Sequence, residues 1–97
     1  MKETSILIAE SSDILLDGIA AMLDKYPGIK VAGKVSCYDS LMNLMDSHSN
    51  HTILLGPILR STKGLDPIEI LKKNYPETRI VEIDLTDVPE TIYKKLS

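Results

Sequence analysis

The stretch Ser5-Ile-Leu-Ile-Ala-Glu-Ser-Ser-Asp-Ile-Leu-Leu-Asp-Gly-Ile-Ala-Ala-Met-Leu23 joins two structural patterns directly. Residues 5–9 form a short apolar run rich in β-branched residues, which is typical of a buried strand. Residues 10–13 offer several helix N-caps, and apolar residues then recur at helical spacing up to Lys25. The stretch therefore predicts a buried strand that leads straight into an amphipathic helix.

The same alternation recurs three times along the chain. Further strands are predicted over residues 29–35, 51–55 and 79–83. Helices are predicted over residues 38–47, from the N-cap Asp66 with Pro67 in the first turn, and from a capping box at 87–90 through Leu96. Short buried strands that alternate with helices predict a parallel sheet covered by helices on both faces. We expect one domain over residues 1–97.

Composition excludes several classes of protein. With 97 residues, 43% of them hydrophobic and 26% charged, the chain has the balance of a globular domain and not of a disordered one. No apolar run approaches the ~20 residues of a membrane span, and the N-terminus resembles no signal peptide, so we expect a cytoplasmic protein. Its single cysteine, Cys37, agrees with a reducing compartment. A net charge of −3 argues against nucleic-acid binding by bulk charge.

The core is expected to centre on the first and third strands. Apolar residues of the first and third helices should pack against these strands. The predicted core consists of Ile6, Ile8, Ile53 and Leu55 on the strands, Ile14, Leu15, Ile19 and Met22 on the first helix, and Ile68 and Leu71 on the third.

The order of motifs resembles the receiver domain of bacterial response regulators, especially the NarL/FixJ-like branch. Residues 6–23 are similar to its opening strand, acidic residues and helix, with Asp17-Gly18 where that branch often has an acidic residue and glycine. Residues 26–33 are similar to its second strand, and residues 75–81 to its turn into the fourth. The resemblance implies a flavodoxin-like three-layer α/β sandwich with strands in the order 2-1-3-4, without the fifth strand and helix of a full receiver.

In that family an aspartate after the third strand accepts a phosphoryl group beside Mg²⁺. Carried over residue by residue, the resemblance puts Glu10 and Ser11 at the paired acidic positions, Gly56 at the acceptor position and Asp84 at the Ser/Thr position after the fourth strand. The lysine after the fifth strand has no counterpart. The resemblance therefore implies a degenerate receiver, or pseudo-receiver, with poor Mg²⁺ binding and no cofactor.

Other polar groups have two interpretations each. Glu10 and Asp84 could form a metal site of their own, but a solvated acidic rim is the preferred interpretation because Mg²⁺ requires more ligands. Asp66 could replace the missing acceptor, but it suits a helix N-cap better. His48 and His51 are interpreted as polar loop groups and not as a metal pair.

Cys37 could likewise be a redox thiol, but it lacks a CxxC partner and a basic setting. An inert small residue is the preferred interpretation.

The expected function is non-enzymatic. We expect a receiver-like signalling or regulatory module that acts by protein–protein interaction, without aspartyl phosphorylation, in a two-component or transcription-regulation context. A phosphate-accepting regulator that uses a displaced acidic residue such as Asp66 or Asp84 is one alternative. A small-ligand sensor at the strand ends, where Gly56 leaves room, is another. In the family a DNA-binding domain commonly follows, so the chain is expected to be an adaptor or part of a longer regulator.

The fourth strand is expected to lie at the edge of the sheet and to carry the interaction surface. Its acidic residues, Glu82 and Asp84, suit an edge strand, where charged side chains discourage pairing with other chains. The exposed edge and the last helix should associate with a protein partner or a second copy through Val81, Ile83, Tyr93 and Leu96.

Overall fold

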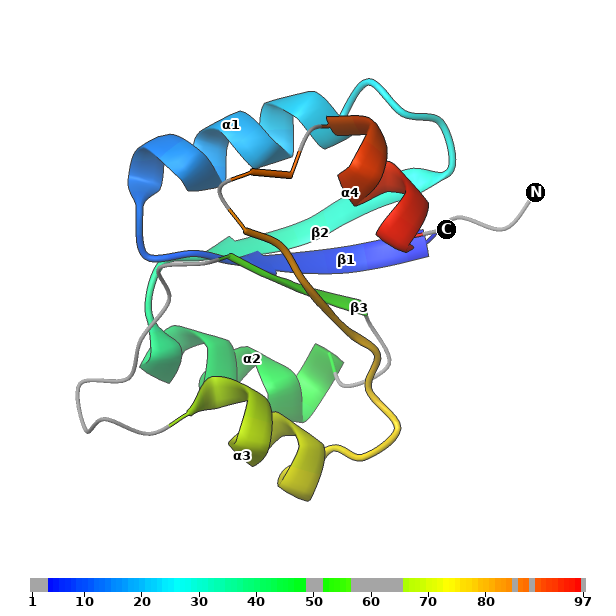
Figure 1. Ribbon diagram of the computed structural model, residues 1–97. Coiled ribbons are helices and arrows are strands. Elements are labelled where there is room, and N and C mark those ends of the chain that lie inside the picture. The colour runs from blue at the N-terminus through cyan, green and yellow to red at the C-terminus, as the bar shows by residue number, and fades with distance from the viewer. Residues whose placement is uncertain (1–3, 49–51, 57–65, 85, 88, 97) are drawn as a thin grey trace.

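The computed structural model describes residues 4–48, 52–56, 66–84, 86–87 and 89–96. Strands and helices alternate in the order β1 (Thr4–Ala9), α1 (Asp13–Leu23), β2 (Ile29–Val35), α2 (Tyr38–His48), β3 (Thr52–Leu55), α3 (Pro67–Asn74), β4 (Ile80–Glu82) and α4 (Pro89–Leu96). The sheet is the middle of three layers, with α1 and α4 on one face and α2 and α3 on the other (Figure 1). The predicted start of the third strand at His51 lies outside the described residues.

The four strands are parallel and lie in the order β2-β1-β3-β4, which confirms the predicted topology. The central strands β1 and β3 are short apolar runs buried from both faces. Residues of β1 alternate between the faces: Ile6 and Ile8 meet α1 and α4, whereas Leu7 and Ala9 meet α2 and α3. The carboxyl ends of all four strands therefore point to one edge of the molecule.

The predicted core is confirmed on the strands and corrected on α1. Ile6, Ile8, Ile53 and Leu55 are buried, as are Ile19 and Leu71, while Ile68 is half-buried. On α1, however, the buried stripe is Leu16, Ile19 and Leu23, and the predicted core residue Ile14 is 86% exposed. Successive helical residues are turned by ~100°, so Ile14 lies almost opposite Leu16. Leu15 and Met22 flank the stripe and are half-buried.

A second prediction, that apolar side chains around β4 are exposed, is wrong because of where the last helix packs. After β4 the chain crosses to the α1 face, and α4 lies beside α1 (Figure 1). The side chains of Val81, Ile83 and Leu96 are thereby buried in the same core cluster as Ile92. Tyr93 is half-buried and stacks on Tyr26, with ring centroids 4.5 Å apart. The chain itself covers these side chains, and association through β4 and α4 stays a prediction.

Within the described part of the chain, no helix has the length and apolar character needed to cross a bilayer.

Candidate functional site

The central candidate site lies where β1 and β3 end side by side. Glu10 follows β1, and its backbone N–H donates to the carbonyl of Val35 at 3.0 Å. Gly56 follows β3, and its N–H donates to the carbonyl of Ala9 at 2.8 Å. The Glu10 residue is completely buried. The structure thus brings together Glu10 and Gly56, two of the residues that the sequence singled out.

The Glu10 side chain occupies the space in front of Gly56. A Cβ atom added at Gly56 would lie 2.0 Å from Oε2, 2.6 Å from Cδ and 2.8 Å from Cβ of Glu10. Non-bonded carbon atoms normally approach only to about 3.5–4.0 Å, so no side chain fits at Gly56 while Glu10 keeps this position. The prediction that Gly56 leaves room for a ligand at this point is therefore wrong.

The segment after Glu10 caps the N-terminus of α1. Ser12 is the N-cap: its Oγ accepts from the backbone N–H of Leu15 at 3.3 Å. The backbone N–H of Ser12 donates to Glu10 Oε1, also at 3.3 Å. Ser11, at the second acidic position of the resemblance, is exposed and carries a hydroxyl in place of a carboxylate.

This set of groups does not fit the Mg²⁺ site that the resemblance implies. Mg²⁺ requires several oxygen ligands in near-octahedral geometry. Here one carboxylate, that of Glu10, is turned toward Gly56, which itself has no side chain to offer. Among the described residues, no three His, Cys, Asp or Glu side chains are grouped so that they could hold a metal ion.

Asp84 lies after β4, at the same edge of the sheet, and its carboxylate is engaged locally. Oδ1 accepts from the backbone N–H of Thr86 at 2.9 Å and from Thr86 Oγ1 at 2.5 Å. These bonds stabilise the charged form and lower the pKa of Asp84. Thr86 was missed in the sequence, although a hydroxyl two residues after an aspartate is a common sign of such a local turn.

The alternatives left open in the sequence are resolved in part. Asp66 is the N-cap of α3, since Oδ1 accepts from the backbone N–H of Ile68 at 3.0 Å. Cys37 is exposed, and the hydrogen bond with Ser40 at 3.1 Å lowers its pKa. His48 ends α2, and His51 lies outside the described residues. Their interpretation as loop groups stays a prediction.

Polar groups of α4 and of the segment before it cap two outward-facing backbone groups at the end of β4. Lys95 Nζ donates to the carbonyl of Glu82 at 3.2 Å and to Asp87 Oδ2 at 2.8 Å. The same Oδ2 accepts from the backbone N–H of Asp84 at 2.9 Å. Arg79 caps the C-terminus of α4, since its guanidinium donates to the carbonyl of Leu96 at 2.8 Å and to that of Lys95. The amide of Ile83 faces the opposite way, into the sheet, and donates to the carbonyl of Leu55 at the end of β3.

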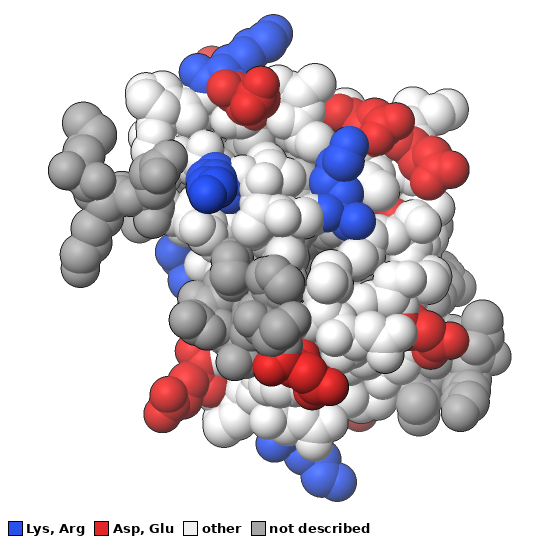
Figure 2. Space-filling view, turned by 180° about the vertical axis from the view of Figure 1, so that it is seen from behind, with Lys and Arg blue, Asp and Glu red and all other residues white. Residues whose placement is uncertain are grey.

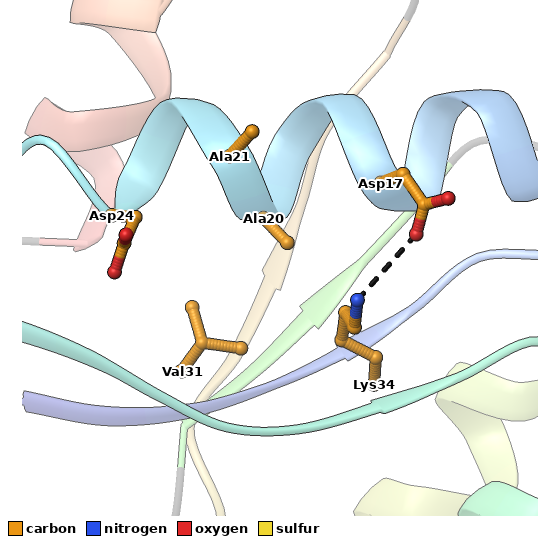
Figure 3. Close-up of a pocket in the computed structure, with 6 residues that line it drawn as sticks. All are labelled: Asp17, Ala20, Ala21, Asp24, Val31 and Lys34. Carbon is orange, nitrogen blue, oxygen red and sulfur yellow. Dashed lines mark hydrogen bonds and ion pairs between the residues drawn. The ribbon is translucent and has the colours of Figure 1, made fainter.

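A groove that the sequence did not indicate lies between α1 and β2, with a volume of about 360 Å³ (Figure 3). From α1 come Asp17, Ala20, Ala21 and Asp24, and from β2 come Val31 and Lys34. Asp17 Oδ1 and Lys34 Nζ form an exposed ion pair at 3.5 Å across one end. Asp17 and Asp24 are seven residues apart, two helical turns, and this spacing was the available sequence signal.

A β-bulge in β2 forms one wall of this groove. Ile6 pairs with Val31 but Leu7 pairs with Gly33, so Ala32 has no partner on β1. Gly33 faces Leu7 and Leu44 on the α2 side of the sheet. Val31 lies on the α1 side with Ile6, and regular alternation from Val31 without a bulge would put Lys34 on the α2 side. The bulge turns Lys34 toward α1 and Asp17.

Comparisons with known proteins support the fold. No family model matches the chain. The chain is 24% identical over 87 residues to the transcriptional regulatory protein MctR of Rhizobium johnstonii, a match that covers 90% of this chain and 41% of MctR. The chain thus spans less than half the length of this curated relative.

Solved structures of RcsB are similar in fold. The RcsB response regulator of Salmonella typhimurium superposes with a TM-score of 0.85 at 18% identity, over 99% of this chain and 60% of that one. The isolated RcsB receiver domain with the phosphomimetic BeF₃⁻ gives 0.76 at 21% identity, over 97% and 70% of the two chains. The non-phosphorylated Escherichia coli domain also gives 0.76 at 21%, over 97% and 73%. The chain therefore has the fold of a response-regulator receiver domain, as the sequence predicted.

Proposed function

We propose that this chain is a non-enzymatic receiver-type module of two-component or transcription regulation, which acts through protein–protein contacts and accepts no phosphoryl group. The receiver fold and the match to a transcriptional regulatory protein support the regulatory context. We also infer that residues 1–97 form one such domain. The cytoplasmic location expected from the sequence stays a prediction.

One observation carries this proposal, namely the position of the Glu10 side chain. It fills the space that an acceptor side chain at Gly56 would need, since a Cβ there would lie 2.0 Å from Oε2. The acceptor is therefore absent in two ways: residue 56 has no side chain, and its place is taken by a group from the neighbouring strand. A carboxylate at this place also repels a dianionic phosphoryl group.

The displaced acceptors receive no support. The Asp66 carboxylate caps α3, and the Asp84 carboxylate accepts two bonds from Thr86. Asp84 is also the wrong group for the Ser/Thr position, because a carboxylate offers no hydroxyl to a phosphoryl oxygen. The proposal therefore names no alternative phosphorylation site.

The direct test uses Mg²⁺ with acetyl phosphate, and Mg²⁺ with beryllofluoride. We expect no phosphoryl mass gain by intact-protein mass spectrometry and no melting shift, with the isolated RcsB receiver as positive control. The Gly56→Asp variant alone should also stay unmodified, because Ser11 and Glu10 remain. A hydroxylamine-sensitive phosphoryl adduct on the wild-type chain would contradict the proposal.

The position of Glu10 has its own test in Gly56→Ala. The added methyl group must displace Glu10, so we expect a loss of about 1–3 kcal/mol in the free energy of unfolding. Gly56 does not have a positive φ, so alanine meets no backbone strain there. In urea titrations the double variant Glu10→Ala/Gly56→Ala should lose less unfolding free energy than the sum of the losses of the two single variants, because the smaller side chain removes the clash. Additive losses would mean that Glu10 does not fill the space.

A further inference from the structure

We propose that the groove between α1 and β2 binds an extended, basic segment of a partner protein, which adds as a strand to the outer edge of β2. This inference rests on the proposed function, in that it gives the protein–protein contact a surface and a partner chemistry. It uses none of the residues at the Glu10–Gly56 site.

The first observation is that β2 is an open edge. It has seven residues and lies at the end of the sheet opposite β4. The register with β1 directs the N–H and C=O groups of Val31 and Lys34 away from the sheet. Within the described residues no side chain caps these groups, in contrast to the bonds from Lys95 and Asp87 along β4. An extended peptide can satisfy such groups by strand addition.

The second observation is the shape of the groove beside this edge. A strand added along β2 would direct every second side chain toward α1. On that side Ala20 and Ala21 leave space between the helix and the strand, and Val31 adds an apolar surface. Figure 3 shows Asp17 and Asp24 on α1 facing Val31 and Lys34 on β2 across this space. Side chains of the added strand can therefore enter the groove.

The third observation is charge, which determines the chemistry of the partner. Two carboxylates and one ammonium group line the groove, so its formal charge is negative. Lys34 pairs with Asp17, whereas Asp24 forms no ion pair with any described residue. Figure 2 shows acidic side chains in the upper part of the molecule, where α1 lies, with basic side chains both above and below them. A lysine or arginine that enters the groove would pair with Asp24.

These observations favour a partner protein over a second copy of this chain. In a copy, the edge strand would present the same bulge and the same exposed Lys30 and Lys34. Lysines and bulges on edge strands are features that discourage pairing between copies. A partner strand without a bulge avoids this conflict of shape, and a lysine or arginine on it that points toward α1 can pair with Asp24.

The probe is a capped heptapeptide of sequence TKVRVKT, with the acidic peptide TEVEVET as control. In ¹H–¹⁵N NMR titrations the basic peptide should shift amides of β2 and α1, and the acidic peptide should not. Asp24→Asn should weaken binding about five-fold, since one exposed charge pair contributes up to about 1 kcal/mol. The matched one-charge control Glu77→Gln, an exposed residue before β4, should change affinity less than two-fold.

Two N-methylated forms of the peptide test strand addition itself. An added strand directs alternate N–H groups toward β2, so methyl groups on one alternate set should abolish binding and those on the other set should not. Equal binding of both forms, shifts confined to β4 and α4, no shifts at millimolar peptide, or a homodimer that excludes the peptide would each overturn the inference. The acetyl phosphate assay tests the proposed function independently of this inference, because peptide binding requires neither phosphate nor Mg²⁺.

Discussion

The two outer strands of the sheet meet solvent in different ways. Along β4, Lys95 bonds the carbonyl of Glu82, Asp87 bonds the amide of Asp84, and α4 buries the side chains on one face. Along β2, the outer backbone groups of Val31 and Lys34 have no such cap within the described residues, and an acidic groove runs beside the strand.

The two edge strands of this sheet are therefore protected from association in different ways. Unpaired strand edges invite association, and proteins protect them with charges, bulges or covering elements. In this chain β4 is covered by a helix and its polar contacts, whereas among the described residues β2 has lysines and a bulge as its protection. We therefore expect disturbances at β4 to cost stability and disturbances at β2 to change binding.

The largest effect is expected from Leu96→Ala. Leu96 is 1% exposed and holds α4 over β4, so its truncation leaves a cavity and should cost about 2–4 kcal/mol in the free energy of unfolding. Urea titration followed by circular dichroism gives the value. The control is Ile14→Ala in the first turn of α1, where the 86% exposed side chain should contribute less than about 0.5 kcal/mol. Equal losses of unfolding free energy in the two variants would contradict the conclusion that α4 covers β4.

The comparison also shows how far the fold could be predicted from the sequence. Short apolar runs and caps such as Asp66 determined the order of strands and helices, because these signals are local. Periodicity could not say on which face of the sheet α4 packs, since an apolar stripe specifies burial and not its partner. Leu96 was therefore expected on an exposed surface but lies in the core, and Ile14 was expected in the core but is exposed.

The next effect concerns Arg79→Gln. The guanidinium of Arg79 donates to two carbonyls at the end of α4, and glutamine cannot reproduce this fork. We expect a loss of about 1 kcal/mol, with faster hydrogen exchange in α4 and unchanged exchange in β2. Lys30→Gln, on the open edge, should leave exchange in both regions unchanged. Faster exchange in β2 for Arg79→Gln would mean that the two edges are coupled.

The candidate site could be predicted only in part, for a similar reason. The resemblance identified Glu10 and Gly56 as separate positions, yet it could not indicate that one fills the space of the other. That contact joins residues far apart in the chain, and no spacing predicts it. The groove was missed because the bulge at Ala32, which turns Lys34 toward Asp17, depends on the register between β1 and β2.

A smaller effect is expected from acid, through Asp87. The hydrogen bond from Lys95, and next that from the amide of Asp84, lower the pKa of Asp87 in the folded protein. A lowered pKa means that the unfolded chain binds more protons, so this contribution is present above the unfolded value of about 3.9 and is lost as pH falls through the folded pKa. Asp87→Asn should therefore flatten the fall in stability on acidification. An unchanged slope in urea titrations from neutral pH down to acid would contradict this role.

The smallest effect is expected from Lys34→Gln, which compares matched lysines on the two edges. The Lys34–Asp17 pair is 3.5 Å long and 46% and 73% exposed, so its loss should change stability by less than about 0.5 kcal/mol. Lys95→Gln should cost more, because Lys95 also bonds the carbonyl of Glu82 and its pair with Asp87 is only 2.8 Å long. In peptide titrations the order should reverse: removal of the Lys34 charge makes the groove more acidic and should strengthen the binding of TKVRVKT, whereas Lys95→Gln should leave it unchanged. If Lys34→Gln destabilises the fold as much as Lys95→Gln and leaves peptide affinity unchanged, the open edge and the covered edge do not differ as proposed.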